Sequence, residues 1–321
     1  MAELPRNIYE QQSANRRNTL VIMVLFVLFL GFLGLGFDVF FLGFGSDGVS
    51  FPLVAIVALM IGAFSADWSL RSGASTILSS AGAVPIPDND PKYQVLRNVV
   101  EEMSIAAGSP KPGLYVIPDP DPNAFATGRD PDHACIAVTE GLLEKLDREE
   151  LQGVIAHEMS HVRNYDIRMM TVVAALVGAV MLLSEFGRRS GRLGIGRVAG
   201  SSRRGKGGAI LFVLWIIALI LAPLISQILA MAVSRQREYL ADASGAELTR
   251  NPRALASALN KIDSAVEPTR SIKKGTAHLC IADPLGRNIN AKEGFFAEIF
   301  GTHPPISKRI MLLHAMAYQH A

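Results

Sequence analysis

Two histidines of this sequence have the spacing of ligands to one metal ion. His157 and His161 enclose Glu158 in the pentapeptide His-Glu-Met-Ser-His. Positions four residues apart lie on the same face of a helix, so both imidazoles can bind a single zinc ion. Glu158 then lies beside the metal, where its carboxylate can take a proton from bound water and pass it to a leaving amine. This spacing predicts metal-assisted hydrolysis of a peptide bond.

A catalytic zinc site has three protein ligands and keeps one position for water. A third histidine six residues after His161 is excluded, because Ile167 occupies that position. The other common third ligand is a glutamate from a later helix, and Glu238 lies 81 residues after His157. Asp242, four residues further along, is expected to orient a ligand imidazole. We therefore expect one zinc ion per chain, bound by His157, His161 and Glu238.

The pentapeptide lies in a predicted helix with a clear beginning. Asp147 and Glu150 form a capping box, and apolar residues follow at helical spacing. Before this helix, a proline-rich linker at 82–91 leads into a helix that ends at Gly108. Short strands are expected at 114–117, 123–128 and 134–139, a helix at 140–146, and a further helix from 251. The region is therefore expected to be an α+β domain with a small sheet and more helix than strand.

Four apolar runs without a charged residue divide the chain. They lie at 18–37, 49–66, 169–184 and 207–234 and contain 20, 18, 16 and 28 residues. About 20 residues of helix cross the hydrocarbon core of a bilayer, so the first, second and fourth runs are predicted to span and the third is marginal. The first run is long and lacks a small-residue cleavage site. We therefore expect it to be an anchor rather than a cleaved signal peptide.

The basic residues orient this arrangement in the lipid bilayer. Arginines precede the first run, whereas the short link after it contains no basic residue. The N-terminus is therefore expected in the cytoplasm, and two crossings return the catalytic residues to that side. We expect a multi-pass protein of the cell membrane with its active site facing the cytoplasm.

These runs predict four parts of the chain. Residues 1–71 hold a cytoplasmic tail and two transmembrane helices, and residues 72–166 hold the first part of the catalytic domain with the zinc helix. Residues 167–234 hold two apolar membrane segments and a basic loop at 187–208. Residues 235–321 hold the second part of the catalytic domain, with the glutamate helix and the C-terminal region.

The basic loop at 187–208 conflicts with the expected orientation. It carries seven basic residues and no acidic residue. If the third and fourth runs both span, this loop lies outside the cell, against the positive-inside rule. If the two runs enter and return as a hairpin, or lie in the membrane plane, the loop stays inside. The sequence leaves both arrangements open.

Composition and charge exclude several classes of protein. Half of the 321 residues are hydrophobic, and the formal net charge of +2 does not indicate a nucleic-acid partner. The two cysteines are far apart and lack the spacing of a disulfide framework or a cysteine metal site. The segment Gly205-Lys206-Gly207 lacks the rest of a phosphate-binding loop, so no use of ATP is expected.

Three motifs together resemble the HtpX-type membrane metalloproteases, which are related to the CAAX prenyl endopeptidases. These motifs are HExxH at 157–161, RExxAD at 237–242 and HPP at 303–305, and their order matches along nearly the whole chain. The resemblance implies a gluzincin-type catalytic domain joined to about four transmembrane helices, mostly α-helical overall. It also implies an ATP-independent quality-control endopeptidase that cuts damaged or misfolded membrane proteins, with a tendency to cut itself.

The resemblance implies three further functional residues. Asn123 opens a segment that resembles the edge strand lying along the substrate backbone, and its side chain is expected to hydrogen-bond substrate or transition state. His303 is expected to stabilise the oxyanion of the tetrahedral intermediate, with Arg309 near it in role. The alternatives are ordinary loop roles, with Asn123 as a turn residue after Pro122 and His303 as a histidine before a proline pair.

Two other functions stay open at this point. A processing enzyme for prenylated CAAX peptides is compatible with the same motifs. A non-catalytic membrane scaffold with a structural zinc ion is the other alternative. Structural zinc sites usually have four protein ligands, often cysteines, and have no need of Glu158.

Overall fold

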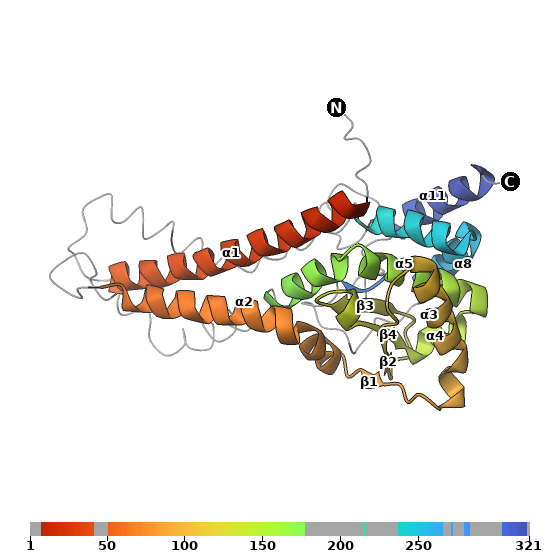
Figure 1. Cartoon of the computed structure of the whole chain (residues 1–321), viewed down its shortest axis with the longest axis horizontal. Coiled ribbons are helices and arrows are strands. Elements are labelled where there is room, and N and C mark those ends of the chain that lie inside the picture. The colour runs from red at the N-terminus through yellow and green to blue at the C-terminus, as the bar shows by residue number, and fades with distance from the viewer. Residues whose placement is uncertain are drawn as a thin grey trace.

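The computed structural model describes residues 8–41, 51–176, 215, 237–265, 271, 279–282 and 304–319. The described chain is mostly helical, with one small sheet. Two long helices lie side by side and extend away from a compact body that contains the sheet and the other helices (Figure 1). The second half of the third apolar run, all of the fourth except Trp215, the loop at 187–208 and His303 lie outside the described residues.

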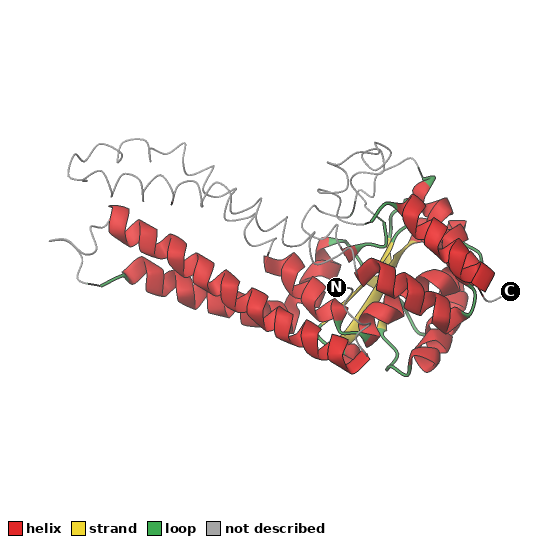
Figure 2. Cartoon of the chain, turned by 90° about the horizontal axis from the view of Figure 1, so that it is seen from above, coloured by secondary structure: helices red, strands yellow, loops and turns green. Residues whose placement is uncertain are grey.

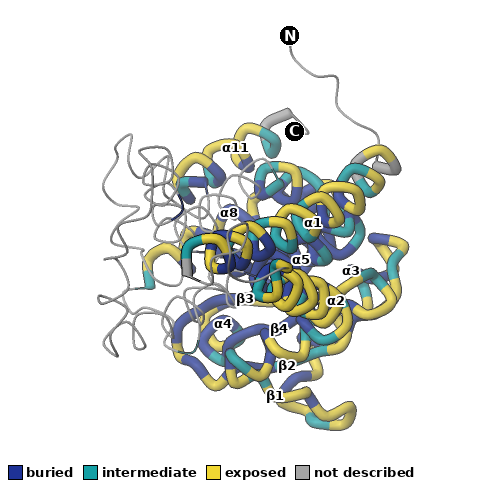
Figure 3. The backbone as a smooth tube through the Cα atoms, turned by 90° about the vertical axis from the view of Figure 1, so that its left-hand side faces the viewer, coloured by how far each residue is buried: buried dark blue, intermediate teal, exposed yellow. Residues whose placement is uncertain are grey.

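The two long helices are α1 (Ile8–Phe41) and α2 (Leu53–Ser80). Both contain stretches long and apolar enough to cross a membrane, Gln12–Phe40 and Leu53–Ser80. Only 17% and 22% of their most apolar windows is buried, and large apolar side chains are exposed along both helices (Figure 3). A core helix of a soluble protein would be mostly buried, so this surface fits a lipid environment.

A carboxylate of α1 hydrogen-bonds to the first turn of α2, at the end of the helix pair where α1 ends and α2 begins. Pro52, the residue before α2, makes no side-chain hydrogen bond that caps this helix. Instead, the buried Asp38 of α1 accepts hydrogen bonds from the backbone N–H groups of Val54 (3.0 Å) and Ala55 (2.7 Å). These are two of the N–H groups that the first turn of a helix leaves without an intrahelical partner. Asp38 therefore acts as the N-terminal cap of α2.

The sheet contains β1 (Val84–Pro85), β2 (Gly113–Ile117), β3 (Ala124–Gly128) and β4 (Ala134–Thr139) in the order β1-β2-β4-β3. β2 and β4 run parallel, and the other two neighbouring pairs are antiparallel. The three predicted strands are therefore confirmed to within a residue or so at each end. β1 was not predicted, because it lies within the proline-rich linker.

The sheet lies among helices in Figure 2. They are α3 (Gln94–Ala107), α4 (Glu140–Lys145), α5 (Arg148–Arg163), α8 (Pro252–Asp263) and α11 (Ile306–Gln319). The predicted beginning of the zinc helix is confirmed, since Asp147 and Glu150 form the capping box at the start of α5. The predicted end of α3 is also confirmed, because Gly108 follows it in the left-handed conformation (φ 61°) that glycine adopts readily.

The two faces of the sheet belong to two different apolar clusters. Ile136 and Val138 of β4 pack with residues of α3, α5 and α8 in the larger cluster. Ala137, which points the other way, packs with Ile77 and Leu78 at the end of α2. Alternate side chains of a strand point to opposite faces, so β4 connects α3, α5 and α8 on one face of the sheet with the end of α2 on the other.

Candidate active site

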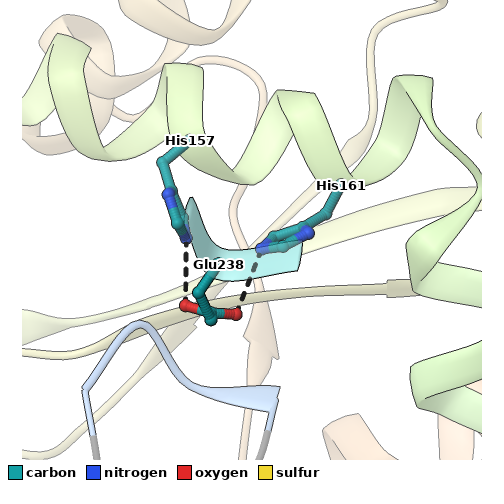
Figure 4. Close-up of side chains that lie close together, drawn as sticks. All are labelled: His157, His161 and Glu238. Carbon is teal, nitrogen blue, oxygen red and sulfur yellow. Dashed lines mark ion pairs between the residues drawn. The ribbon is translucent and has the colours of Figure 1, made fainter. Parts of the chain in front are cut away.

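The structure brings His157, His161 and Glu238 together at the centre of the body. Both histidines lie on the buried face of α5, with ring centroids 4.9 Å apart and ring planes at 90°. Glu238 comes from a helical segment at 237–249 and points between the two imidazoles (Figure 4). Its Oε2 lies 3.6 Å from Nε2 of His157, and its Oε1 lies 3.6 Å from Nε2 of His161. The three predicted ligands therefore offer their atoms to one point.

The donor geometry fits a metal ion better than direct hydrogen bonds. One ligand atom from each residue lies within 4.8 Å of the others. Two atoms that each lie about 2.0 Å from a tetrahedral zinc ion are about 3.3 Å apart, close to the observed 3.6 Å. A contact of 3.6 Å is too long for a hydrogen bond. Two imidazoles and one carboxylate are also a common donor set of catalytic zinc sites.

Each imidazole has a further carboxylate close to its Nδ1 atom. Nδ1 of His157 lies 3.0 Å from Oδ1 of Asp242, and Nδ1 of His161 lies 3.2 Å from Oδ2 of Asp166. A carboxylate at Nδ1 fixes the proton there and turns Nε2 toward the metal. The predicted place of Asp242 agrees with this geometry, whereas the place of Asp166 was not predicted.

Asp166 reaches His161 through a tight turn at the end of α5. Tyr165 adopts a positive φ of 60°, which is uncommon for a residue other than glycine. The turn redirects the chain into the helical segment at 166–176, so that Asp166 faces back toward the zinc helix. The only sign in the sequence that Asp166 contacts His161 is that an acidic residue lies five positions after this histidine. Its meaning depends on a turn that the sequence pattern does not specify.

Glu158 is buried beside the two histidines. Its Oε1 has no hydrogen-bond partner among the described residues. Burial raises the pKa of Glu158, while the neighbouring His157 and His161 act in the opposite direction. A carboxyl group with a raised pKa is well matched to taking up a proton and releasing it in a later step. The position of Glu158 is therefore compatible with its predicted role.

Arg309 lies behind the site and is fully buried. Its Nε and Nη2 donate hydrogen bonds of 2.8 and 2.7 Å to the two oxygens of Asp242, and its Nη1 donates one of 2.8 Å to the carbonyl of Ile281. Burial alone raises the pKa of Asp242, but Arg309 outweighs burial and lowers it to about 2. These contacts support a role for Arg309 in positioning Asp242. Its predicted role near the oxyanion stays a prediction.

Asn123 lies at the outer edge of the sheet, where its side chain is fully buried. Its Oδ1 accepts a hydrogen bond from the N–H of Ala124 (3.0 Å), and its Nδ2 donates one to the carbonyl of Ala282 (3.1 Å). The N–H of Ile281 donates to the carbonyl of Ala124 (2.9 Å). The chain's own segment 279–282 therefore pairs with the first part of β3. A substrate strand that pairs with Ala124 has to replace Ile281, and contact of Asn123 with substrate stays a prediction.

Similarity to known proteins decides the class of the enzyme. Residues 91–317 match the model of peptidase family M48. The chain belongs to this family. It is 46% identical to a protease HtpX homolog of Caldanaerobacter subterraneus subsp. tengcongensis over 97% of this chain and 98% of that protein. It is 39% identical to a protease HtpX homolog of Ligilactobacillus salivarius over 96% of this chain and 100% of that protein.

A solved structure is also similar, the crystal structure of S. mikatae Ste24p. The likeness has a TM-score of 0.49 and 19% sequence identity, and covers 89% of this chain. This M48 chain spans 61% of the length of that protein.

The family match and the HtpX homologues confirm the predicted resemblance. The chain is a metalloendopeptidase of the HtpX type, and its two exposed apolar helices agree with a membrane protein. The M48 match implies a metal ion, typically zinc, and the cluster of His157, His161 and Glu238 can hold one.

The charges around the M48 site favour a divalent cation. Burial alone lowers the pKa of His161, but the hydrogen bond to Asp166 and the nearby carboxylate of Glu238 outweigh burial and raise it to about 10. The surrounding carboxylates thus attract positive charge to this point, whether a proton or a metal ion. Among the described residues, four carboxylates and two guanidinium groups lie around the site, from Glu158, Asp166, Glu238, Asp242, Arg237 and Arg309. With neutral imidazoles this set carries two negative charges, which a divalent ion balances.

We predict that Arg309→Met weakens zinc binding by about 10- to 100-fold, because Asp242 then loses the group that holds it against His157. The free energy of unfolding of the metal-free protein should fall by about 3–5 kcal/mol, since a buried ion pair is broken. Competition with a chelator measures the zinc affinity of the folded protein. Lys308→Met, at an exposed neighbouring position of α11, is the control.

Arg309→Lys separates positioning from general destabilisation. Lysine keeps the charge but cannot make the paired hydrogen bonds to both carboxylate oxygens. We expect an intermediate zinc affinity for this variant. Wild-type affinity in both Arg309 variants would show that Asp242 does not depend on Arg309.

Proposed function

We propose that this M48 peptidase is a zinc-dependent endopeptidase of the cell membrane that cuts damaged or misfolded membrane proteins. The observation that carries this proposal is the place of the ligand cluster. The zinc helix α5 ends against α1, where Nε2 of Gln12 donates a hydrogen bond of 2.8 Å to the carbonyl of Arg163. The site therefore lies close to one end of the apolar helix pair. An active site at the membrane surface suits substrates that emerge from the bilayer.

In this proposal His157, His161 and Glu238 hold the zinc ion in a gluzincin-type arrangement, with two histidines from one helix and a glutamate from a later helix. When bound, the zinc ion polarises the peptide carbonyl and lowers the pKa of a coordinated water. Asp242 and Asp166 keep the two imidazoles oriented toward it.

Glu158 moves the proton. Its carboxylate takes a proton from the attacking water, and the new C–O bond forms as the carbonyl becomes tetrahedral. Glu158 then gives this proton to the leaving nitrogen as the C–N bond breaks, which returns it to its starting state. His303 and Asn123 are proposed to stabilise the negative charge on the former carbonyl oxygen, with Arg309 nearby.

We further propose that the chain crosses the membrane four times, twice within residues 1–71 and twice within residues 167–234, and that residues 72–166 and 235–321 form the two parts of the catalytic domain. The position of Trp215, in the fourth apolar run, supports a crossing. Its indole Nε1 donates a hydrogen bond of 3.1 Å to the carbonyl of Leu33, near the end of α1 that lies away from the zinc helix. Trp215 stands 22 residues before Arg237, beside the zinc site. A helix of 22 residues is about 33 Å long, which is enough to cross the hydrocarbon core.

This arrangement predicts that the basic loop lies outside the cell, although the catalytic site faces the cytoplasm. We expect an impermeant thiol reagent to label a Ser201→Cys variant in intact cells, in a background with Cys135 and Cys280 replaced. Ser264→Cys, at an exposed site of the catalytic region, should be labelled only after lysis. Protection of position 201 in intact cells would support the hairpin arrangement instead.

The substrate class is tested by comparing cleavage of three substrates by the zinc-loaded enzyme. We expect cleavage of casein and of a destabilised membrane protein in detergent, and slower cleavage of the same membrane protein in its stable form. We expect a prenylated CAAX peptide to be cut no faster than casein or the destabilised membrane protein. Cleavage of the prenylated peptide alone would replace the quality-control role with a processing role.

A further inference from the structure

We propose that Asn15 of the membrane helix α1 is a positioning residue for the zinc ligand His161, acting through Asp166. Asn15 is buried, with 5% of its surface exposed. Its Nδ2 donates hydrogen bonds of 2.7 Å to Oδ1 of Asp166 and 2.9 Å to the backbone carbonyl of Asn164. The inference rests on the zinc site of the proposed function. It adds a part of the chain that lies 146 residues before His161 in sequence.

Asp166 needs a hydrogen-bond donor because its carboxylate is buried and only one of its two oxygens contacts the zinc ligand His161. Only 1% of its surface is exposed, and its Oδ2 faces Nδ1 of His161 at 3.2 Å. Its Oδ1 receives the hydrogen bond from Asn15, whereas Nε of Arg237 lies 3.6 Å away, too far for a hydrogen bond. A buried carboxylate without hydrogen bonds is costly and would turn to find another donor. Asn15 therefore sets the angle from which Asp166 meets His161.

The amide of Asn15 is well suited to this task. A carboxamide nitrogen carries two hydrogens, and here one is directed to Asp166 and the other to the backbone of Asn164. The backbone contact fixes the plane of the amide, and the fixed amide then fixes the carboxylate. A neutral donor also leaves the negative charge of Asp166 available to His161. The other ligand, His157, has an equivalent support in Asp242, which Arg309 holds.

Other contacts of α1 dock the helix on the same turn without touching Asp166. Gln12 donates a hydrogen bond of 2.8 Å to the carbonyl of Arg163, and the guanidinium of Arg16 lies 4.1 Å from the ring centre of Tyr165. These neighbours make it possible to weaken the docking of α1 while leaving the Asn15–Asp166 hydrogen bond in place. They therefore separate a positioning role of Asn15 from a merely structural one.

The experiment measures zinc affinity of the full-length protein in detergent, by competition with a chromophoric chelator after the native metal has been removed. We expect Asn15→Ala to weaken zinc binding by about 10- to 100-fold. Asn15→Asp keeps the shape of the side chain but places a second carboxylate against Asp166, so a loss at least as large is expected. Gln12→Ala and the matched exposed variant Asn18→Ala should bind zinc as the wild type does.

A second readout follows the ligand geometry itself. With cobalt(II) in place of zinc, the visible absorption bands report the arrangement of the ligands, and we expect them to change in Asn15→Ala and not in Gln12→Ala. Unchanged zinc affinity in a folded Asn15 variant would overturn the proposal, and so would equal weakening by Gln12→Ala. Both readouts are independent of peptide cleavage. A wild type that binds zinc but cuts no protein would count against the proposed function while leaving this test intact.

Discussion

Glu238→Ala is expected to weaken zinc binding by more than about 100-fold, the largest effect on metal affinity that we predict. The substitution leaves two imidazoles and removes the only carboxylate that faces both Nε2 atoms among the described residues. The substitution also removes one of the acidic partners of the fully buried Arg309, because Nη1 of Arg309 lies 3.4 Å from Oε2 of Glu238. Zinc content after dialysis and chelator competition measure this loss.

Glu247→Ala is the matched control for this prediction, because Glu247 is an exposed glutamate of the same helical segment. It should bind one zinc ion per chain with wild-type affinity. If Glu238→Ala also kept wild-type affinity, Glu238 would not be the third ligand. The site would then need a ligand from outside the described residues.

Glu158→Gln is expected to keep one zinc ion per chain and to lose cleavage by a factor of about 10²–10⁴ in kcat/KM. Glutamine has nearly the shape of glutamate, so the neighbouring imidazoles keep their places. It cannot accept a proton, so the water is no longer activated and the leaving nitrogen receives no proton. Casein cleavage and bound zinc measured on the same sample check both halves of this prediction.

Glu149→Gln, at an exposed position in the first turn of α5, should cut casein at the wild-type rate. Wild-type cleavage by zinc-loaded Glu158→Gln would exclude Glu158 as the proton carrier. Loss of zinc together with activity would instead give Glu158 a structural part in the site.

The sequence predicts that His157, His161 and Glu238 lie together because its signals here are local or strongly periodic. The spacing of His157 and His161 defines one helix face, and the capping box at Asp147 defines where that helix begins. Glu238 follows from a small set of known third ligands. The structure brings these residues together in the expected arrangement.

The parts of the site that were not predicted depend on contacts between distant segments. Asp166 supports His161 only because a turn with a positive φ at Tyr165 returns it to the zinc helix. Asn15 reaches Asp166 only because the membrane helix packs on that turn. Pairing of Ile281 with Ala124 is equally non-local. No periodicity within a segment encodes such contacts.

The long apolar helix α2 shows a further limit of predicting helices from apolar runs. The run at 49–66 ends at a charge, yet α2 continues to Ser80. Asp67 and Arg71 lie one turn apart and form an exposed ion pair of 2.9 Å. Charged residues end an apolar run without ending a helix. The last turns of α2 then pack against the sheet, where Ile77 and Leu78 are buried.

The most direct test of the central claim is a zinc titration of the wild-type protein. Protein purified in detergent is stripped with a chelator, zinc is added back in steps, and casein cleavage and bound zinc are measured on each sample. We predict no cleavage by the stripped protein, and a rate that rises with bound zinc and levels off at one ion per chain. Cleavage that persists at full rate in the stripped protein would contradict a zinc-dependent peptidase built on His157, His161 and Glu238.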